Sequence, residues 1–315
     1  NDDIFARVTH LADAKSHGMV MFIDFSGSMN NILKDTIKQT LTLVSFCKKV
    51  NIPFDVYSFT TSYEDRGDFN EGEIDHTGTA INQLLSSSMT KSDFELAYEQ
   101  LFMMGAMVNV YGGRAYWSKQ EGLGGTPLNE TIMASRFILR DFKKKHGVQK
   151  VNAVFLTDGA AQSMYHKRTG DMPTRGYAID IDGKVLSSRN TSYLTDDLIA
   201  MIGKEFTTIG YFLCERAYDF KGQIWSAYDD YVSSDKMSEY RKTYNKNKFL
   251  ALDKAHGYDR YFIVKAEGRS MNTDTEEFEV SEDAKKGEIA RAFKKFANSK
   301  KSNRMLATQF AEMVA

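Results

Sequence analysis

The chain has 315 residues, of which 42% are hydrophobic and 26% charged, and its formal net charge at pH 7 is -1. This composition predicts a globular protein with a large core, and it offers no general attraction to nucleic acid or to an anionic membrane. Cys47 and Cys214 are too few for a disulfide framework or a zinc site, and no run approaches the ~20 apolar residues that span a bilayer. We therefore expect a cytoplasmic protein without a membrane or nucleic-acid partner, and, because the chain does not begin with Met, further residues upstream of Asn1.

Strand and helix patterns alternate along the chain. Residues 19–24, an apolar run that ends at Asp24, predict a buried strand, residues 30–49 carry apolar side chains at helical spacing, and residues 53–60 predict a second strand. The same patterns continue as a helix at 127–145, a strand at 151–157, a helix at 194–205, strands at 206–213 and 260–266, and helices near 283–298 and 303–314. This alternation predicts an α/β fold with a doubly wound, mostly parallel central sheet flanked by helices.

We expect residues 1–315 to form a single domain with two insertions and C-terminal helices over 283–314. The insertion at 62–122 has helical patterns near 78–89 and 93–107, and the second of these is rich in Met and Phe, which favours packing on the sheet. The insertion at 160–192 contains a loop and then a hairpin pattern, with strands at 177–181 and 184–188 around Asp182-Gly183.

The motif Asp24-Phe25-Ser26-Gly27-Ser28 stands at the end of the first predicted strand. Side chains alternate along an extended segment, so the oxygen atoms of Asp24, Ser26 and Ser28 turn towards one point as the strand enters a loop. Oxygen ligands of this kind suit a small hard cation, and Mg²⁺ prefers six oxygens in an octahedron. The three residues alone are a weak signal, because a Ser-rich turn gives the same pattern.

Two later segments add oxygen atoms at strand-to-helix junctions. Thr126 lies in Gly124-Gly125-Thr126-Pro127-Leu128, and Asp158 follows the predicted strand at 151–157. In an open parallel sheet the carboxyl ends of the strands meet at one edge, where ligands bind. Taken singly, Thr126 is also explained as a helix N-cap with Pro127 in the first helical position, and Asp158-Gly159 as an ordinary turn.

In this order, Asp24, Ser26, Ser28, Thr126 and Asp158 resemble the metal-ion-dependent adhesion site (MIDAS) of von Willebrand factor type A domains. The resemblance implies a Mg²⁺ ion, with Mn²⁺ or Ca²⁺ as substitutes, bound by the serine hydroxyls and, in one state, by Thr126. It implies that the two aspartates act largely through water. Neutral hydroxyl ligands leave the ion electron-poor, so the site is expected to take a carboxylate of a partner protein.

Within that superfamily, the first-strand motif, the Phe59-Thr60-Thr61 strand ending, the helical insertion and Thr157-Asp158-Gly159 resemble the C-terminal domain of CobT-type subunits of cobalt chelatase. Such subunits work with AAA+ ATPases, and relatives are encoded by large tailed bacteriophages beside a CobS-like or MoxR-like ATPase. The resemblance implies a non-catalytic partner subunit, in the host cytoplasm if phage-encoded. The Gly-Gly-Thr-Pro-Leu segment departs from chelatase subunits, so cobalt insertion itself is not implied.

Two other functions remain open from the residues. A Mg²⁺-dependent phosphatase of haloacid dehalogenase type would use Asp24 as nucleophile, but its D-x-D-x-T pattern is broken at Ser26, and the D-x-D pair Asp180 and Asp182 falls in the predicted hairpin. A metal-independent structural or virion component with the same fold is the third hypothesis. The sequence has no phosphate-binding G-x-x-x-x-G-K-[ST] loop, no H-E-x-x-H and no G-x-S-x-G, so no catalytic or cofactor-binding residue is assigned.

Overall fold

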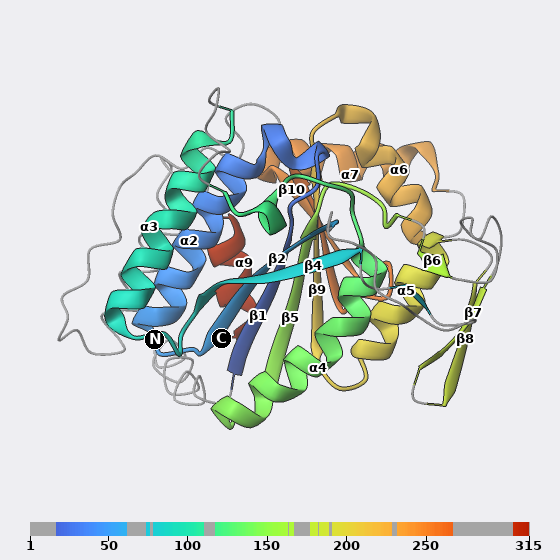
Figure 1. The fold of residues 1–315 in the computed structure, drawn as a ribbon. Helices are drawn as coiled ribbons and strands as arrows, with labels where there is room; N and C mark the ends of the chain where they lie inside the picture. The colour runs from blue at the N-terminus through green and yellow to red at the C-terminus, as the bar shows by residue number, and fades with distance from the viewer. Residues whose placement is uncertain are drawn as a thin grey trace, which may run out of the picture.

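A central seven-stranded sheet organises the computed structural model, which describes residues 17–61, 74–75, 78–109, 117–162, 164–166, 177–181, 183–188, 191–228, 232–266 and 305–314. The strand order is β10-β11-β9-β5-β1-β2-β4 (Figure 1). Their bounds are β1 His17–Asp24, β2 Phe54–Thr61, β4 Thr79–Ser86, β5 Lys150–Thr157, β9 Thr207–Cys214, β10 Phe249–Asp253 and β11 Arg260–Lys265.

The five inner strands run parallel, and the two edge strands, β4 and β10, run antiparallel to their neighbours. Parallel strands are covered on both faces, so their sequences are continuous apolar runs. In β1, all residues from Gly18 to Asp24 are buried. This confirms the expected doubly wound, mostly parallel sheet.

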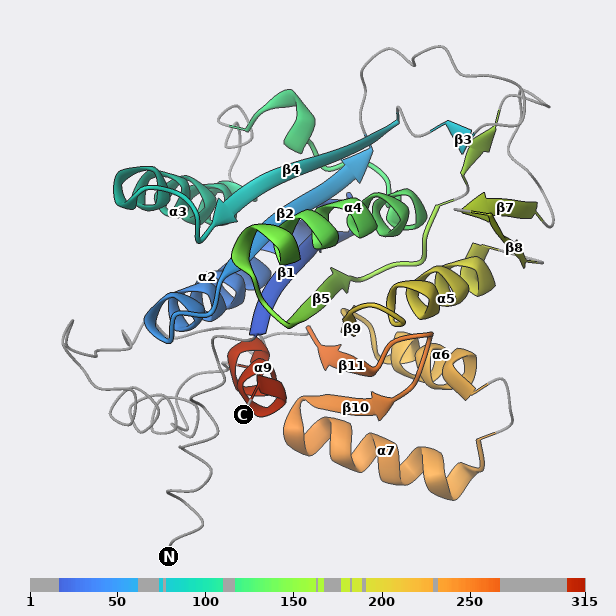
Figure 2. The ribbon, with the colours of Figure 1, turned by 90° about the horizontal axis from the view of Figure 1, so that it is seen from below.

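Helices cover both faces of the sheet (Figure 2). On one face, β1 residues Met19, Met21 and Ile23 share a core cluster with residues of α2, α3 and α9. On the other face, Val20 and Phe22 share a second cluster with residues of α4, α5, α6 and α7. The helices are α2 Leu33–Lys49, α3 Lys91–Met107, α4 Leu128–His146, α5 Thr191–Ile202, α6 Ala217–Tyr228, α7 Ser234–Asn247 and α9 Met305–Val314.

Short elements complete the described part of the chain. β3 (Ile74–Asp75) pairs with β6 (Tyr165–His166), and β7 (Tyr177–Ile181) pairs with β8 (Lys184–Ser188). The 3-10 helices are η2 (Ser28–Asn31) and η4 (Lys119–Glu121). The hairpin predicted at 177–181 and 184–188 is therefore confirmed.

One predicted helix is wrong. Residues 78–89 do not form a helix, because Thr79–Ser86 is the edge strand β4, paired antiparallel with β2. Ile81, Leu84 and Leu85 fit a helical spacing as well as a strand, and the open edge of β2 decides between the two. The helix predicted at 93–107 is confirmed as α3, although its Met- and Phe-rich stripe is divided: Leu101 and Met104 are buried, whereas Phe102 and Met103 are exposed.

The other predicted elements correspond to β1, β2, α2, α4, β5, α5, β9, β11 and α9. Sequence analysis missed α6, α7 and β10. The helix expected near 283–298 lies outside the described residues. Cys47 and Cys214 are buried free thiols, and no described helix has the length and apolar character needed to cross a membrane.

The strand order creates a crevice at the ends of β1 and β5. From β1 the chain moves to β2 on one side of the sheet, whereas β5 pairs with β1 on the other side. Connections leave in opposite directions at such a switch point, and the crevice between them is where ligands bind in open α/β sheets. Asp24 ends β1, and Asp158 follows β5, so both carboxylates lie at this crevice.

Candidate metal centre

The carboxylate of Asp24 is the most deeply buried group of the site. Its side chain is fully buried at the end of β1. Asp24 Oδ1 accepts the Ser26 backbone N–H at 2.8 Å, and Oδ2 accepts the Thr157 hydroxyl at 2.6 Å. Burial raises the pKa of Asp24 from 3.8 to about 7, against the opposing effect of these hydrogen bonds, and the nearby Asp158 raises it further. The fold thus holds a carboxyl group whose charge is not compensated by these two neutral donors.

The hydroxyl groups of Ser26 and Ser28 lie between Asp24 and the surface. Ser28 donates its hydroxyl hydrogen to Asp158 Oδ1 at 2.8 Å, and the hydroxyls of Ser26 and Ser28 lie 3.0 Å apart. The Ser26 side chain also forms a hydrogen bond that lowers the pKa of Asp24, so Ser26 lies between the two carboxylates. Ser26 is buried and Ser28 is exposed, so the oxygens lead from the core of the sheet to solvent. The structure therefore brings Asp24, Ser26, Ser28 and Asp158 together, as predicted from the strand ends.

Thr126 reaches the same edge through a loop paired with the first motif. Gly124 forms an isolated parallel bridge with Ser26, and Gly27 donates its backbone N–H to the Gly124 carbonyl at 2.8 Å. A Cβ atom at Gly124 would lie only 3.0 Å from the Thr60 hydroxyl, so a larger residue would have to push its neighbours aside.

The side chain of Thr126 does not cap α4. Pro127 is the N-cap residue and no side chain caps the helix, so the explanation of Thr126 as an N-cap is wrong. The Thr126 hydroxyl lies 4.0 Å from the position of a Cβ atom at Gly159, beside Asp158. The hydroxyl thus lies near the end of β5, next to Asp158, without a role in helix capping.

Burial and two neighbouring carboxylates both disfavour the charged form of Asp158. Burial raises the pKa of Asp158, the Ser28 hydrogen bond opposes this, and Glu215 and Asp219 raise it further by charge repulsion. Glu215 is tied to the site by the Asn31 side-chain amide, which donates to its carboxylate at 2.9 Å. A bound cation would relieve this repulsion, so the electrostatics fit a positively charged ion.

The donor set fits a hard divalent cation. Hydroxyl and carboxylate oxygens are what Mg²⁺ prefers, and such sites commonly retain water ligands. Within the described residues, no three His, Cys, Asp or Glu side chains are grouped to hold a metal ion, so an ion at this edge would depend on the serine and threonine hydroxyls as well as on the two carboxylates. The five predicted residues, Asp24, Ser26, Ser28, Thr126 and Asp158, remain the candidate ligands.

Three residues that act on the two aspartates of the site were not predicted from the sequence. Thr157, Glu215 and Asp219 were given no role, although Thr157 holds Asp24 and the two acidic residues act on Asp158. The only sequence feature that could have indicated them is their place at the ends of predicted elements. Thr157 ends β5, Glu215 follows β9, and Asp219 lies in the first turn of α6.

The first aspartate of the separate D-x-D pair considered for a phosphatase lies outside the central sheet. Asp180 is in β7, which pairs with β8 in a separate two-stranded sheet, and its Oδ1 accepts the Gly183 backbone N–H at 2.8 Å. Asp180 therefore stabilises a hairpin turn, and the position two residues after Asp24 is a serine. Asp182 lies outside the described residues.

No protein-family model matches the chain, and no curated protein matches it. Solved structures give distant likenesses. The pilus adhesin SpaC from Lactobacillus rhamnosus GG, in its open conformation, is 14% identical over 71% of this chain and 26% of its own, with a TM-score of 0.37. Proximal thread matrix protein 1 from the mussel byssus, with a zinc-occupied MIDAS motif, is 12% identical over 63% of this chain and 38% of its own, with a TM-score of 0.26.

A third likeness is the type V pili tip protein Mfa5 from Porphyromonas gingivalis, 15% identical over 47% of this chain and 20% of its own, with a TM-score of 0.29. This chain therefore spans well under half the length of each of these proteins. TM-scores this low do not establish a shared fold or function. The α/β fold rests on the sheet order and strand directions described above.

Proposed function

We propose that this chain is a metal-dependent protein–protein interaction module that binds an acidic residue of a partner through a Mg²⁺ ion. One observation carries the proposal: Ser26 and Ser28 connect the buried carboxylate of Asp24 to the half-buried carboxylate of Asp158 at the switch point of the sheet. This oxygen-rich edge is open to solvent at Ser28, where a partner side chain has access.

Each residue has a distinct task in this proposal. Asp24 fixes the loop through the Ser26 backbone N–H, and Thr157 fixes Asp24 in turn. Ser26 and Ser28 present neutral hydroxyl oxygens, and Thr126 adds a third at the same crevice. When bound, Mg²⁺ would supply positive charge and an open coordination position for a carboxylate. Asp24 must be ionised for the cation to bind, so proton release accompanies binding.

We further propose that the partner is a AAA+ ATPase of MoxR or CobS type, to which this chain serves as a CobT-like, non-catalytic subunit in the cytoplasm. The support is the resemblance of the motifs Asp24–Ser28 and Thr157–Gly159 to such subunits. Metal occupancy and partner capture would then be linked, because a carboxylate shared by both stabilises both. Mn²⁺ or Ca²⁺ would substitute for Mg²⁺ to the extent that each accepts these oxygens.

The test is capture of an ATPase of this type, encoded beside the gene for this chain, by the immobilised chain. We expect capture in Mg²⁺, its loss in EDTA, and its loss with Ser26→Ala combined with Ser28→Ala. The matched control is Ser87→Ala combined with Ser88→Ala, two exposed serines beyond β4 at the opposite edge of the sheet, which keeps full capture.

The metal is measured separately by titration calorimetry with Mg²⁺ and Mn²⁺. Saturable metal binding that the Ser26 and Ser28 variant loses supports the site even if this ATPase is not captured, and that result overturns only the choice of partner. Capture that persists unchanged in EDTA contradicts the metal-dependent mechanism.

A further inference from the structure

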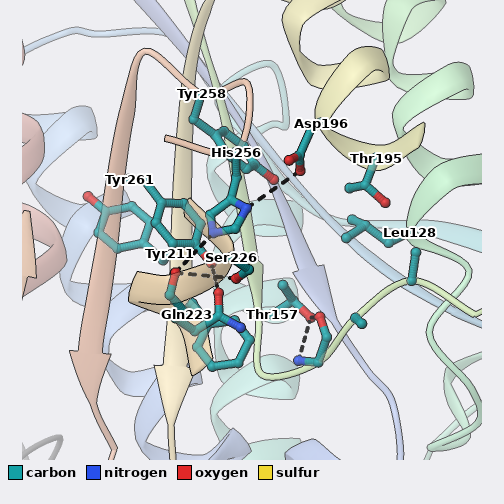
Figure 3. Close-up of a pocket in the computed structure, with 14 residues that line it drawn as sticks. Leu128, Thr157, Thr195, Asp196, Tyr211, Gln223, Ser226, His256, Tyr258 and Tyr261 are labelled. Atoms are coloured by element: carbon teal, nitrogen blue, oxygen red, sulfur yellow. Dashed lines mark hydrogen bonds and ion pairs between the residues drawn. The ribbon is translucent and has the colours of Figure 1, made fainter. Parts of the chain in front are cut away.

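A cavity of about 310 Å³ lies beside the candidate metal centre (Figure 3). It is enclosed by residues from the ends of β5 and β9, from α5 and α6, and from the turn between β10 and β11. Thr157 and Gly159 line it, and these two residues flank Asp158. The volume is within the range of small-ligand sites. Nothing in the proposed metal mechanism uses this space.

Aromatic rings form one wall of the cavity. Tyr258 and Tyr261 are buried and stack with ring centroids 5.5 Å apart. Gly210 in β9 makes room for them, because a Cβ atom there would lie 2.6 Å from the Tyr261 ring and 2.9 Å from the Tyr258 ring. The Tyr261 hydroxyl donates to the Gln223 side-chain carbonyl at 2.7 Å, which fixes the ring. The wall is therefore preformed.

A single carboxylate faces these rings. Among the described residues that line the cavity, Asp196 is the only acidic one, and none is Lys or Arg. Burial raises the pKa of the Tyr258 phenol, and the charge of the nearby Asp196 raises it further. Its side chain is 34% exposed, and Oδ1 lies 3.6 Å from His256 Nδ1, which is an ion-pair distance when the imidazole is protonated but too long for a hydrogen bond. The carboxylate thus retains capacity to accept hydrogen bonds.

The turn that carries His256 is held against α5. His256 and Gly257 have positive φ values of 52° and 75°, and a Cβ atom at Gly257 would lie 2.2 Å from the Asp196 carbonyl oxygen. A non-glycine residue in the left-handed region is uncommon and is typical of positions that the surrounding structure constrains. His256 Nε2 lies 3.3 Å from the main-chain carbonyl of Gln223 in α6, so the turn bridges both helices. Figure 3 shows the His256 ring between Asp196 and Tyr261, and its centroid lies 4.7 Å from that of the Tyr261 ring.

We propose that this cavity binds a guanidinium group, supplied by an arginine side chain of the partner protein. Aromatic faces attract cations, and a planar guanidinium stacks on tyrosine while it donates to a carboxylate. Asp196 supplies the opposite charge, and the tyrosine wall supplies the stacking surface. An anionic ligand would be repelled by Asp196, and a purely apolar ligand would leave Asp196, Thr195 and Gln223 without water.

The guanidinium proposal rests on the proposed function, because the arginine would belong to the same partner that binds the metal. Thr157 and Gly159 belong both to the cavity wall and to the metal edge. A partner with an arginine near its acidic residue would engage both sites at once, and the second contact would gain from high effective concentration. The partner chemistry is therefore an acidic and a basic residue side by side on one surface.

The probe is arginine capped at both ends, N-acetyl-arginine methylamide, titrated in EDTA at pH 8 and followed by ligand-observed NMR. We expect saturable binding with a dissociation constant on the order of 1 mM, as for other ligands of this size. Capped citrulline, its neutral isostere, should bind at least tenfold more weakly. Asp196→Asn should weaken capped arginine at least tenfold. The matched control, Asp197→Asn, changes the next residue of α5, which is exposed and does not line the cavity, and should bind as the parent does.

The variant with Ser26→Ala and Ser28→Ala separates this proposal from the metal mechanism. In EDTA it should bind capped arginine as the parent does, whatever its metal binding. Equal binding of capped citrulline and capped arginine to the parent overturns the proposal without reference to any variant. Full binding by a folded Asp196→Asn protein, checked by thermal unfolding, overturns it as well.

Discussion

Replacement of Asp24 by asparagine should stabilise the metal-free protein and abolish its response to Mg²⁺. The pKa of Asp24 rises from 3.8 to about 7 on folding, chiefly because the side chain is fully buried. For an acid, a raised folded-state pKa favours the protonated fold. The metal-free protein therefore loses stability as pH rises from about 4 to about 7, and the full cost is present above pH 7.

The magnitude follows from the two pKa values. At about 1.4 kcal/mol per pH unit, the interval from 3.8 to about 7 corresponds to roughly 4 kcal/mol of unfolding free energy. The asparagine keeps a carbonyl oxygen for the Ser26 N–H. Its amide replaces the oxygen that accepts from Thr157, and the Thr157 hydroxyl has an alternative acceptor in the Gly159 carbonyl at 3.2 Å. We therefore expect a gain of about 2 to 4 kcal/mol at pH 8.

The assay is urea unfolding at pH 8 and pH 5, in EDTA and in excess Mg²⁺. In EDTA the advantage of Asp24→Asn over the parent should shrink between pH 8 and pH 5. In Mg²⁺ the parent should gain about 3 kcal/mol at a hundredfold excess over its dissociation constant, and the variant should gain nothing.

Asp55→Asn is the matched control. Asp55 is a buried carboxyl of β2 whose pKa burial also raises, but it lies at the opposite edge of the sheet, where it pairs with Ser86. Its variant should keep the Mg²⁺ response of the parent. The reasoning is refuted if Asp24→Asn destabilises the metal-free protein at pH 8, or if Mg²⁺ stabilises that variant as much as the parent.

Three further predictions concern proton coupling and the β10–β11 turn. The Mg²⁺ affinity of the parent should fall about tenfold per pH unit below about pH 7, because Asp24 must lose its proton; calorimetry that finds the same affinity at pH 5.5 and 7.5 contradicts this. Thr157→Val removes the hydroxyl that donates to Asp24, which raises the Asp24 pKa further and should weaken Mg²⁺ binding at pH 7 about tenfold; an unchanged affinity contradicts the role of Thr157. Gly257→Ala should cost at least about 2 kcal/mol in urea unfolding, because its Cβ would collide with the Asp196 carbonyl, whereas Gly183→Ala, with φ of 77° in open space, should cost about 1 kcal/mol; equal costs would contradict the close approach.

The parallel strands can be predicted from the sequence, because strands that are buried on both faces are rich in apolar residues. Residues 19–23 and 153–156 are continuous apolar runs, and the structure places them side by side in β1 and β5. The edge strand β4 was misread, since its pairing with β2 is a tertiary contact and its apolar residues fit two periods. Helix α7 was missed because only Met237 and Tyr244 of its fourteen residues are buried, which leaves little periodic signal.

The residues of the candidate site that are close in sequence or end a strand could likewise be predicted. The spacing of Asp24, Ser26 and Ser28 brings their oxygens together within one strand-to-loop transition, and a strand end predicts the place of Asp158. The acidic residues Glu215 and Asp219 act on Asp158 from a different strand and helix, so nothing in their local sequence marks them. The cavity beside the site depends on the β10–β11 turn, and β10 was itself missed.

The most direct measurement of the central claim is an anomalous difference map from crystals of this chain grown with MnCl₂. The account predicts one strong peak at the crevice between β1 and β5, within coordination distance of the hydroxyl oxygens of Ser26 and Ser28, and no such peak for the variant with both serines replaced by alanine. An ordered parent site without a manganese peak, or a peak held by other residues only, would contradict it.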